Sequence, residues 1–241
     1  MNLIIDIGNT RSKAAVFKED TLIKVIVFDK KKIVKKIKKI ILKYPISSGI
    51  ISSVGLISDK KIKTLKKITP FIELSATTKV PFINLYKTPS TLGVDRIALA
   101  TASLKNHKNK NVLIIDAGTC ITFDFINSKK EYLGGAISLG IKMRFKALHK
   151  YTANLPLLDI DPLNNFIGNT TETSINSGVI NGVYNEIEGV IEQYKKKYTD
   201  LTVVLTGGDT NFLAEQLKSS IFANPNFLLE GLNEILNYNK D

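Results

Sequence analysis

The sequence contains few of the residues that build disulfide frameworks and histidine-rich metal sites. Its 241 residues include one cysteine, Cys120, two histidines and no tryptophan. A single cysteine excludes an internal disulfide and is typical of proteins in reducing compartments. His107 and His149 have no third metal ligand near them in the sequence. We therefore expect both histidines at the surface and a packing role for Cys120.

Long hydrophobic runs are also absent. No stretch of about 18 apolar residues occurs, so we expect no membrane-spanning segment. The first residues lead directly into an apolar, strand-like segment, without a basic leader or a cleavage site of small residues. Together with the lone cysteine, these absences predict a cytoplasmic protein with no membrane partner.

Acidic residues are few beside the basic ones, 22 against 34, which gives a net charge of +12. In Lys30–Lys43 the apolar residues recur at helical spacing and lysines fill the other positions, and Lys60–Lys67 repeats the pattern. No aromatic residues lie between these lysines, and no nucleic-acid-binding module is recognisable. We interpret both segments as amphipathic helices with a solvated face and expect no nucleic-acid partner.

The first turn of the chain combines residues suited to phosphate chemistry. The apolar run Leu3–Ile5 leads to Asp6, a glycine and several polar residues, and a second apolar run follows over Ala14–Phe17. This pattern predicts a buried strand, a tight turn and a returning strand. Glycine allows a ligand close to the backbone. Asp6 can hold a metal ion or its bound water, and the Thr10 hydroxyl and nearby backbone N–H groups suit phosphate oxygens.

The same phrase occurs a second time. Leu113–Thr119 matches Leu3–Asn9, with Leu, Ile, Ile, Asp and Gly identical at one constant offset. The repeat indicates an internal duplication in which Asp6 and Asp116 face one cleft. The alternative is that the two aspartates cap unrelated hairpins, because Asp is common in turns.

The order of predicted elements divides the chain into two α/β lobes. Each half opens with three strand-like segments and continues with alternating helices and strands. The polar stretch Asn106–Asn111 is the expected join, which gives lobes of residues 1–108 and 109–241. Helices are predicted over Thr91–Lys105 and Thr170–Lys197.

Four small-residue clusters follow strands, but none is a Walker-type phosphate loop, and no G-x-G-x-x-G follows a strand. In their order, and with the repeat, the clusters resemble the acetate-and-sugar-kinase/actin-like ATPase superfamily. That resemblance implies a two-lobed actin-like (ribonuclease H-like) duplicated fold with mixed sheets and an interlobe cleft. The clusters are Asp6–Lys13, Asp116–Thr122, Gly134–Gly140 and Thr206–Asp209.

The chain as a whole resembles the type III pantothenate kinases, whose motifs it matches in family order across nearly its full length. One departure is Leu139, where related sequences usually have proline. The matching residues are Asp6–Thr10 with Lys13, Tyr86 with Pro89, Gly93–Arg96, Asp116–Thr119 with Thr122 and Asp124, Gly134–Ile137 with Gly140, Thr171 with Ser177 and Gly178, Thr206–Gly208, and Leu229–Leu232.

This resemblance implies ATP-dependent phosphorylation of the 4′-hydroxyl of pantothenate, the first step towards coenzyme A, with Mg²⁺ and a monovalent cation, K⁺ or NH₄⁺. It implies that Asp95 is the general base and that Asp116 binds the monovalent cation. It also implies a homodimer in which Thr171, favoured over Thr170 by alignment to Ser177, reaches the partner's substrate pocket. The implied substrate-binding residues are Tyr86, Gly93, Val94, Asp95, Arg96 and Thr171. The implied ATP-binding residues are Asp6, Ile7, Gly8, Asn9, Thr10, Arg11, Ser12, Lys13 and Thr119.

The residue types suit this reaction. Phosphoryl transfer needs in-line placement, charge neutralisation and a proton acceptor at the attacking hydroxyl. Asp95 can accept that proton, and Arg96 can keep it ionised and bind substrate oxygens. The plainer alternative is that Asp95 only complements the dipole of a helix start. Lys13 can neutralise phosphate charge, although strand alternation can also turn it elsewhere.

Two other functions stay open from the sequence. One is a kinase of the same superfamily that acts on another small alcohol. The other is a non-catalytic regulatory protein that binds a nucleotide, although such a protein needs no general base.

Overall fold

A computed structural model describes residues 1–55, 57–161 and 166–240. The chain forms two compact units. The first contains Met1–Asn109, Lys129–Leu133 and Asn226–Asp241, and the second contains Lys110–Ser128 and Gly134–Pro225. The division into lobes at residues 108 and 109 stays a prediction, and the compact units add that the C-terminal helix packs with the first part of the chain.

The first unit is built on a mixed five-stranded sheet of order β3-β2-β1-β4-β5. The first three strands form an antiparallel meander, whereas β4 runs parallel to both β1 and β5. The central strand β1 is buried along its whole length, because its apolar residues are covered on both faces. The strands are β1 (Asn2–Ile7), β2 (Ser12–Lys18), β3 (Thr21–Phe28), β4 (Ser48–Ser53) and β5 (Phe71–Glu73).

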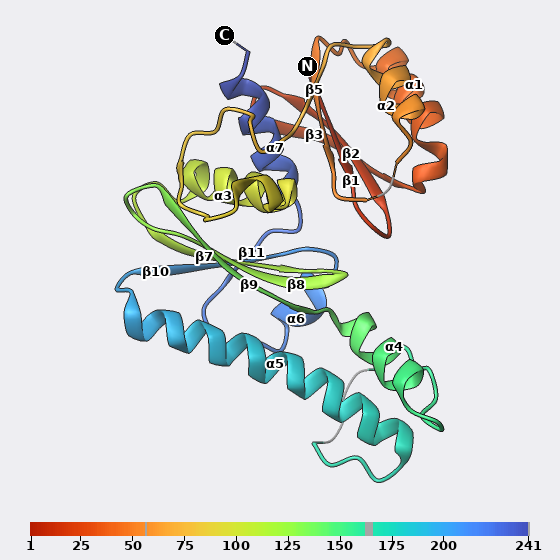
Figure 1. Ribbon diagram of the computed structural model, residues 1–241, viewed down its shortest axis with the longest axis vertical. Coiled ribbons are helices and arrows are strands. Elements are labelled where there is room, and N and C mark those ends of the chain that lie inside the picture. The colour runs from red at the N-terminus through yellow and green to blue at the C-terminus, as the bar shows by residue number, and fades with distance from the viewer. Residues whose placement is uncertain (56, 162–165, 241) are drawn as a thin grey trace. The chain divides into compact units, whose positions relative to one another are not determined.

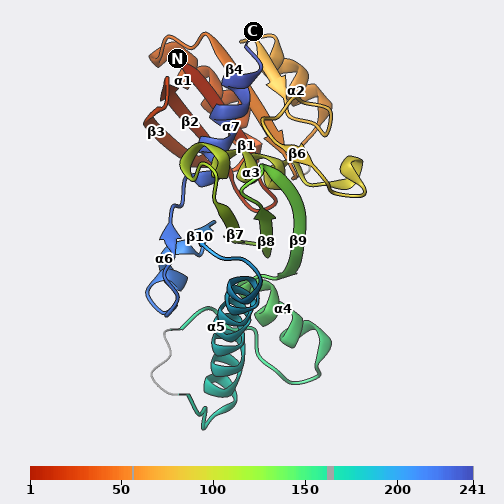
Figure 2. The same ribbon diagram turned by 90° about the vertical axis from the view of Figure 1, so that its left-hand side faces the viewer.

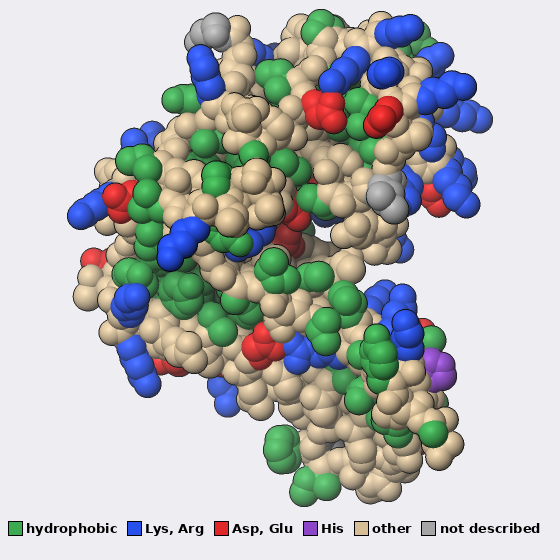
Figure 3. Space-filling model, in the orientation of Figure 1, with side chains coloured by type: hydrophobic (Ala, Val, Ile, Leu, Met, Phe, Trp, Pro, Cys, Tyr) green, Lys and Arg blue, Asp and Glu red, His purple; other side chains and the backbone are tan. Residues whose placement is uncertain are grey.

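Helices α1 (Ile33–Lys43) and α2 (Asp59–Lys66) cover one face of this sheet (Figure 1). Their buried residues, among them Ile37 and Leu65, pack against the odd-numbered residues of β1. The lysines lie outward, and Figure 3 shows blue side chains gathered over these two helices. Both amphipathic helices predicted from the lysine-rich segments are therefore present.

Helices α3 (Val94–Asn106) and α7 (Phe227–Tyr238) lie side by side over the opposite face (Figure 2). Asn2 of β1 donates hydrogen bonds from its Nδ2 to Asn233 and Asn237 of α7, at 2.7 and 2.9 Å. A 3₁₀ turn, η2 (Pro89–Thr91), precedes α3. The helix predicted to begin at Thr91 begins at Val94, because Pro89 starts the 3₁₀ turn and Gly93 is the N-cap residue of α3.

The second sheet has the order β11-β10-β7-β8-β9-β6. Strand β6 pairs with Glu131 and Tyr132 at the start of β9, and these residues all belong to the first unit. The strands are β6 (Ile83–Asn84), β7 (Asn111–Ala117), β8 (Cys120–Ile126), β9 (Glu131–Leu139), β10 (Leu201–Thr206) and β11 (Phe222–Ala223).

The long helix α5 (Thr171–Lys197) covers one face of the second sheet, as Figure 1 shows. Its buried Val179, Val183 and Ile187 recur at helical spacing and pack with the odd-numbered residues of β7. Helix α4 (Ile141–Tyr151) packs against α5, and the short α6 (Thr210–Ala214) follows β10. The predicted long helix is confirmed to within one residue at its start. Within the described part of the chain, no helix is long and apolar enough to cross a membrane.

The repeated sequence forms two equivalent arrangements. The hairpin β1–β2 pairs Asp6 with Lys13, and the hairpin β7–β8 pairs Asp116 with Thr122. In each unit, the first strand of the hairpin also has a parallel neighbour, β4 or β10. Both aspartates therefore occupy the same place in the two units, as an internal duplication predicts.

Candidate active site

The first phosphate-type turn lies between β1 and β2. The Gly8 N–H donates to the Arg11 carbonyl at 3.1 Å, and the N–H groups of Val54 and Gly55 donate to the Ile7 carbonyl at 3.2 and 2.9 Å. A Cβ at Gly55 would lie 2.3 Å from the Gly8 carbonyl oxygen, so this contact requires glycine. The end of β4 thus packs directly against the turn.

The predicted ATP-binding residues of this turn differ in how far their side chains are exposed to solvent. Asn9, Thr10 and Arg11 are exposed at the tip of the turn, whereas the side chains of Ile7 and Ser12 are fully buried. The buried pair can offer a ligand only backbone groups, a distinction that the motif alone does not make.

Asp6 is 7% exposed and lies between two charged groups. Lys13 pairs with it across the hairpin, on the same face of the sheet, which resolves the open question of the lysine's direction. Burial raises the pKa of Asp6 to about 7; the charge of Lys13 lowers it and that of Asp95 raises it further. Asp6 and Asp95, far apart in sequence, therefore lie within electrostatic reach inside the first unit.

Asp95 sits in the first turn of α3, where Gly93 is the N-cap residue. Its Oδ1 accepts a hydrogen bond from the Arg96 N–H at 2.8 Å. Burial raises the pKa of Asp95, and this backbone hydrogen bond and the Arg96 charge oppose the rise. The carboxylate interacts with the helix start, as the plainer alternative proposed, and its charge also acts on Asp6, which capping does not require.

Tyr86 and Arg96 come together as the motif implies. The guanidinium carbon of Arg96 lies 5.6 Å from the centre of the Tyr86 ring, and Tyr132 stands 6.3 Å from Tyr86, ring centre to ring centre. Arg96 is 5% exposed, so its charge acts in a largely desolvated setting. This group suits an anionic or strongly polar substrate portion. Tyr132 was not predicted, because it comes from a distant strand.

In the second unit, three of the small-residue clusters meet around Asp116. The Gly140 N–H donates to the Thr119 carbonyl at 3.2 Å, and the Asp209 N–H donates to the Ala117 carbonyl at 3.0 Å. Gly207 has φ of +102°, and a Cβ there would lie 2.5 Å from Asp116 Oδ1. The backbone at Gly207 therefore packs closely against the carboxylate, and this contact requires glycine.

Asp209 is a further charged residue at this site. Burial raises its pKa, and the charge of Lys142, at the start of α4, lowers it. The sequence placed Asp209 in a small-residue cluster but gave it no role. The charge of Lys142 therefore acts on a residue far from it in the chain, which no local pattern reveals.

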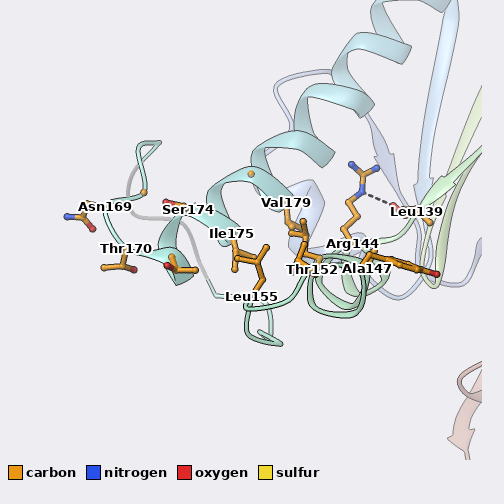
Figure 4. Close-up of a pocket in the computed structure, with 15 residues that line it drawn as sticks. Leu139, Arg144, Ala147, Thr152, Leu155, Asn169, Thr170, Ser174, Ile175 and Val179 are labelled. Carbon is orange, nitrogen blue, oxygen red and sulfur yellow. Dashed lines mark hydrogen bonds between the residues drawn. The ribbon is translucent and has the colours of Figure 1, made fainter.

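Thr171 lies in a different setting, a pocket of about 1180 Å³ within the second unit. Figure 4 shows Leu155, Ile175 and Val179 turned toward one another between α4 and α5, with Arg144 at the far side. None of the other predicted site residues is in the lining of this pocket among the described residues.

The two threonines at this helix start have different roles. The Thr170 hydroxyl caps α5 by accepting from the Thr173 N–H at 3.2 Å, whereas Thr171 is exposed at the first helical position. The Thr170 hydroxyl is thus engaged in the helix cap, and the assignment of the site residue to Thr171 stays a prediction.

No group of three His, Cys, Asp or Glu side chains placed to hold a metal ion occurs among the described residues. A metal at this site would instead share ligands with phosphate oxygens, as Mg²⁺ does in nucleotide sites. The buried Asp6 carboxylate fits such a role, because carboxylate oxygen is a hard ligand.

Comparison with solved structures shows the fold. The chain superposes on a candidate Baf-family transcriptional activator from Campylobacter jejuni with a TM-score of 0.62 at 23% identity, covering 98% of both chains. It superposes on a ROK-family glucokinase from Streptomyces griseus, solved with glucose and AMPPNP, with a TM-score of 0.51 at 10% identity, again over 98% of both. The fold is the two-lobed, actin-like α/β fold with mixed sheets that the sequence predicts.

Comparison with sequences shows the family. Residues 2–193 match the family model described as type III pantothenate kinase. A type III pantothenate kinase of Christiangramia forsetii is 51% identical, over 100% of this chain and 99% of the relative. One of Flavobacterium johnsoniae is 44% identical over the same shares. The chain belongs to the type III pantothenate kinase family.

Proposed function

We propose that this protein transfers the γ-phosphoryl group of ATP to the 4′-hydroxyl of pantothenate, the first step of coenzyme A synthesis. The observation that carries the proposal is that Asp95, at the start of α3, lies within electrostatic reach of Asp6 and beside Arg96, whose guanidinium lies over the Tyr86 ring. The direct test is pantothenate-dependent release of ADP by the purified protein. Release with another alcohol alone would favour a kinase for that alcohol.

In this proposal, Asp95 removes the proton of the attacking hydroxyl. Its pKa is raised by burial, which makes the carboxylate a stronger base than an exposed aspartate. Arg96 and Tyr86 bind the polar part of pantothenate, with Gly93 and Val94 beside them. Proximity and charge neutralisation supply the remaining catalysis, as in other phosphoryl transfers.

The exposed turn Asn9–Arg11, with Lys13 and Thr119, binds the ATP phosphates. ATP carries Mg²⁺, and Asp6 holds that metal or a water bound to it. Support comes from the burial of Asp6 beside Lys13 and from the exposure of the turn. The lone cysteine and the biosynthetic role support a cytoplasmic location.

Asp116 is proposed to bind a monovalent cation, K⁺ or NH₄⁺. Support comes from the position of this carboxylate where three small-residue clusters meet, with the Ala117 carbonyl oxygen also close to Gly207. We expect replacement of K⁺ by Na⁺ at equal ionic strength to lower kcat several-fold, because the smaller ion fits the same oxygens less well. In Asp116→Asn the difference between the two salts should vanish. Equal wild-type rates in K⁺ and Na⁺ would reject this site.

The protein is also proposed to work as a homodimer, with Thr171 reaching the substrate of the partner subunit. Support comes from the apolar lining of the pocket between α4 and α5, with exposed Leu139 and Tyr151 at its rim. A second subunit would cover this surface.

Mixed dimers test the shared site. Asp95→Asn and Thr171→Val should each be weakly active alone. Co-expressed with different tags, they should recover about a quarter of wild-type activity, because half of random dimers are mixed and each mixed dimer has one intact site. No recovery in purified mixed dimers would place Thr171 outside the partner's site.

A further inference from the structure

Ser52 lies directly beside Asp6 and has an unusual environment. The parallel pairing of β1 and β4 sets Ser52 opposite Asp6. Ser52 is 0% exposed, and its Oγ has no hydrogen-bond partner among the described residues. Buried hydroxyl groups normally form hydrogen bonds, because an unmet one costs free energy. This hydroxyl therefore needs an explanation.

The register places Ser52 on the functional face of the sheet. Paired residues of neighbouring strands project to the same face, and on this face Ser48 Oγ donates to Asn2 Oδ1 at 3.2 Å. The same face is covered by α7, and β4 packs against α3, which carries Asp95. Ser52 therefore lies on the same face of the sheet as Asp6, the face that α7 and the Asp95-bearing α3 cover.

The second unit repeats the arrangement. The pairing of β7 and β10 sets Thr206 opposite Asp116, and Thr206 is also buried. At the preceding position of each strand pair, β1 with β4 and β7 with β10, both paired residues are apolar. The duplication thus retains a hydroxyl next to each aspartate, although a buried parallel strand usually contains apolar residues there.

We propose that Ser52 is a positioning residue for Asp6: its hydroxyl donates a hydrogen bond to the ionised Asp6 carboxylate and fixes the direction in which it meets the metal or its water. Neighbouring strands are about 4.8 Å apart, so rotation about χ1 brings Oγ within reach of the carboxylate. The proposal rests on the proposed role of Asp6.

Other charged groups near Asp6 leave this role unfilled. Lys13 approaches from β2 and Asp95 from α3, and Arg96 stacks on Tyr86. The acidic residues of α7 have partners elsewhere: Asn106 Nδ2 donates to Glu230, and Lys105 bonds to Glu234. Among the residues opposite Asp6 in the two neighbouring strands, Ser52 offers the neutral donor and Lys13 the charged one.

The test compares Ser52→Ala with Ser52→Thr, which keeps the hydroxyl, and with Ser48→Ala, which removes a hydroxyl from the same face and strand. We expect Ser52→Ala to lower kcat/KM roughly 10-fold at pH 7 and to shift the acid limb of its pH profile upward by about 0.5–1 pH unit, because the ionised carboxylate loses a donor. Its Tm should not fall at pH 5, where the Asp6 carboxyl is protonated in the folded protein and the proposed hydrogen bond to the ionised form is absent. Both other variants should keep the wild-type profile.

Two further measurements separate this inference from the role of Asp6. A ¹³C NMR titration of the Asp6 carboxyl in ligand-free protein should give a higher midpoint in Ser52→Ala than in wild type. An unchanged midpoint and profile in Ser52→Ala, with Asp6→Asn inactive, would overturn the inference and leave Asp6 in place. If Asp6→Asn keeps full activity, the proposed role of Asp6 fails first.

Discussion

Replacing Asp95 by asparagine is expected to lower kcat by roughly 10²-fold or more while the fold stays intact. Asparagine keeps the shape and can still accept the hydrogen bond from the Arg96 N–H, so the start of α3 should hold. It cannot accept a proton, so the loss of a positioned base should appear in the chemical step. Single-turnover kinetics with saturating ATP measure that step directly.

Asp59→Asn is the matched control for this variant. Asp59 is also an acidic residue in the first turn of a helix, α2, but it is exposed. We expect Asp59→Asn to keep the wild-type kcat. The only effect that Asp59 shares with Asp95 is the weak interaction of its charge with the helix dipole. A wild-type kcat in Asp95→Asn would remove Asp95 from the mechanism and leave only its place at the helix start.

Replacing Asp6 by asparagine should reduce activity and raise stability together. The buried carboxylate has a pKa of about 7, above the ordinary value of an unfolded chain, so the folded state binds its proton more tightly. Above pH 7, ionisation of Asp6 therefore opposes folding. Asp6→Asn should raise the free energy of unfolding by about 1–3 kcal/mol at pH 8, and kcat/KM should fall roughly 10²-fold.

The stability gain has a defined pH range. It should be complete above pH 7, decline as the pH falls toward 4, and vanish where the carboxyl is protonated in both states. Glu73→Gln on β5 is the control, since its exposed ion pair with Lys66 contributes little. Urea unfolding at pH 5 and pH 8 measures both variants. Equal stability of Asp6→Asn and wild type at pH 8 would contradict the pKa shift.

Much of the fold follows from local pattern. The strands β1 and β7 each contain the apolar run Leu-Ile-Ile followed by Asp, and the helices α1 and α5 show the spacing of one buried face. These signals are contained in a few neighbouring residues, so periodicity and turn residues suffice to predict them.

The features that sequence did not predict depend on pairing between distant segments. The place of Ser52 beside Asp6 follows from the register of β1 with β4, and that of Tyr132 beside Tyr86 from β9. Likewise, only the folded hairpin shows that Ser12 turns into the core while Thr10 is exposed. Register and burial are tertiary properties, so the family motif names the segment but not which side chains face the ligand.

Release of ADP by the purified protein with ATP, Mg²⁺ and K⁺, measured with and without pantothenate, tests the central proposal most directly. We predict release that depends on pantothenate in the wild type and is lost in Asp95→Asn. Absence of pantothenate-dependent release from wild-type protein that still binds ATP would contradict the proposal and favour another alcohol substrate or a regulatory nucleotide-binding role.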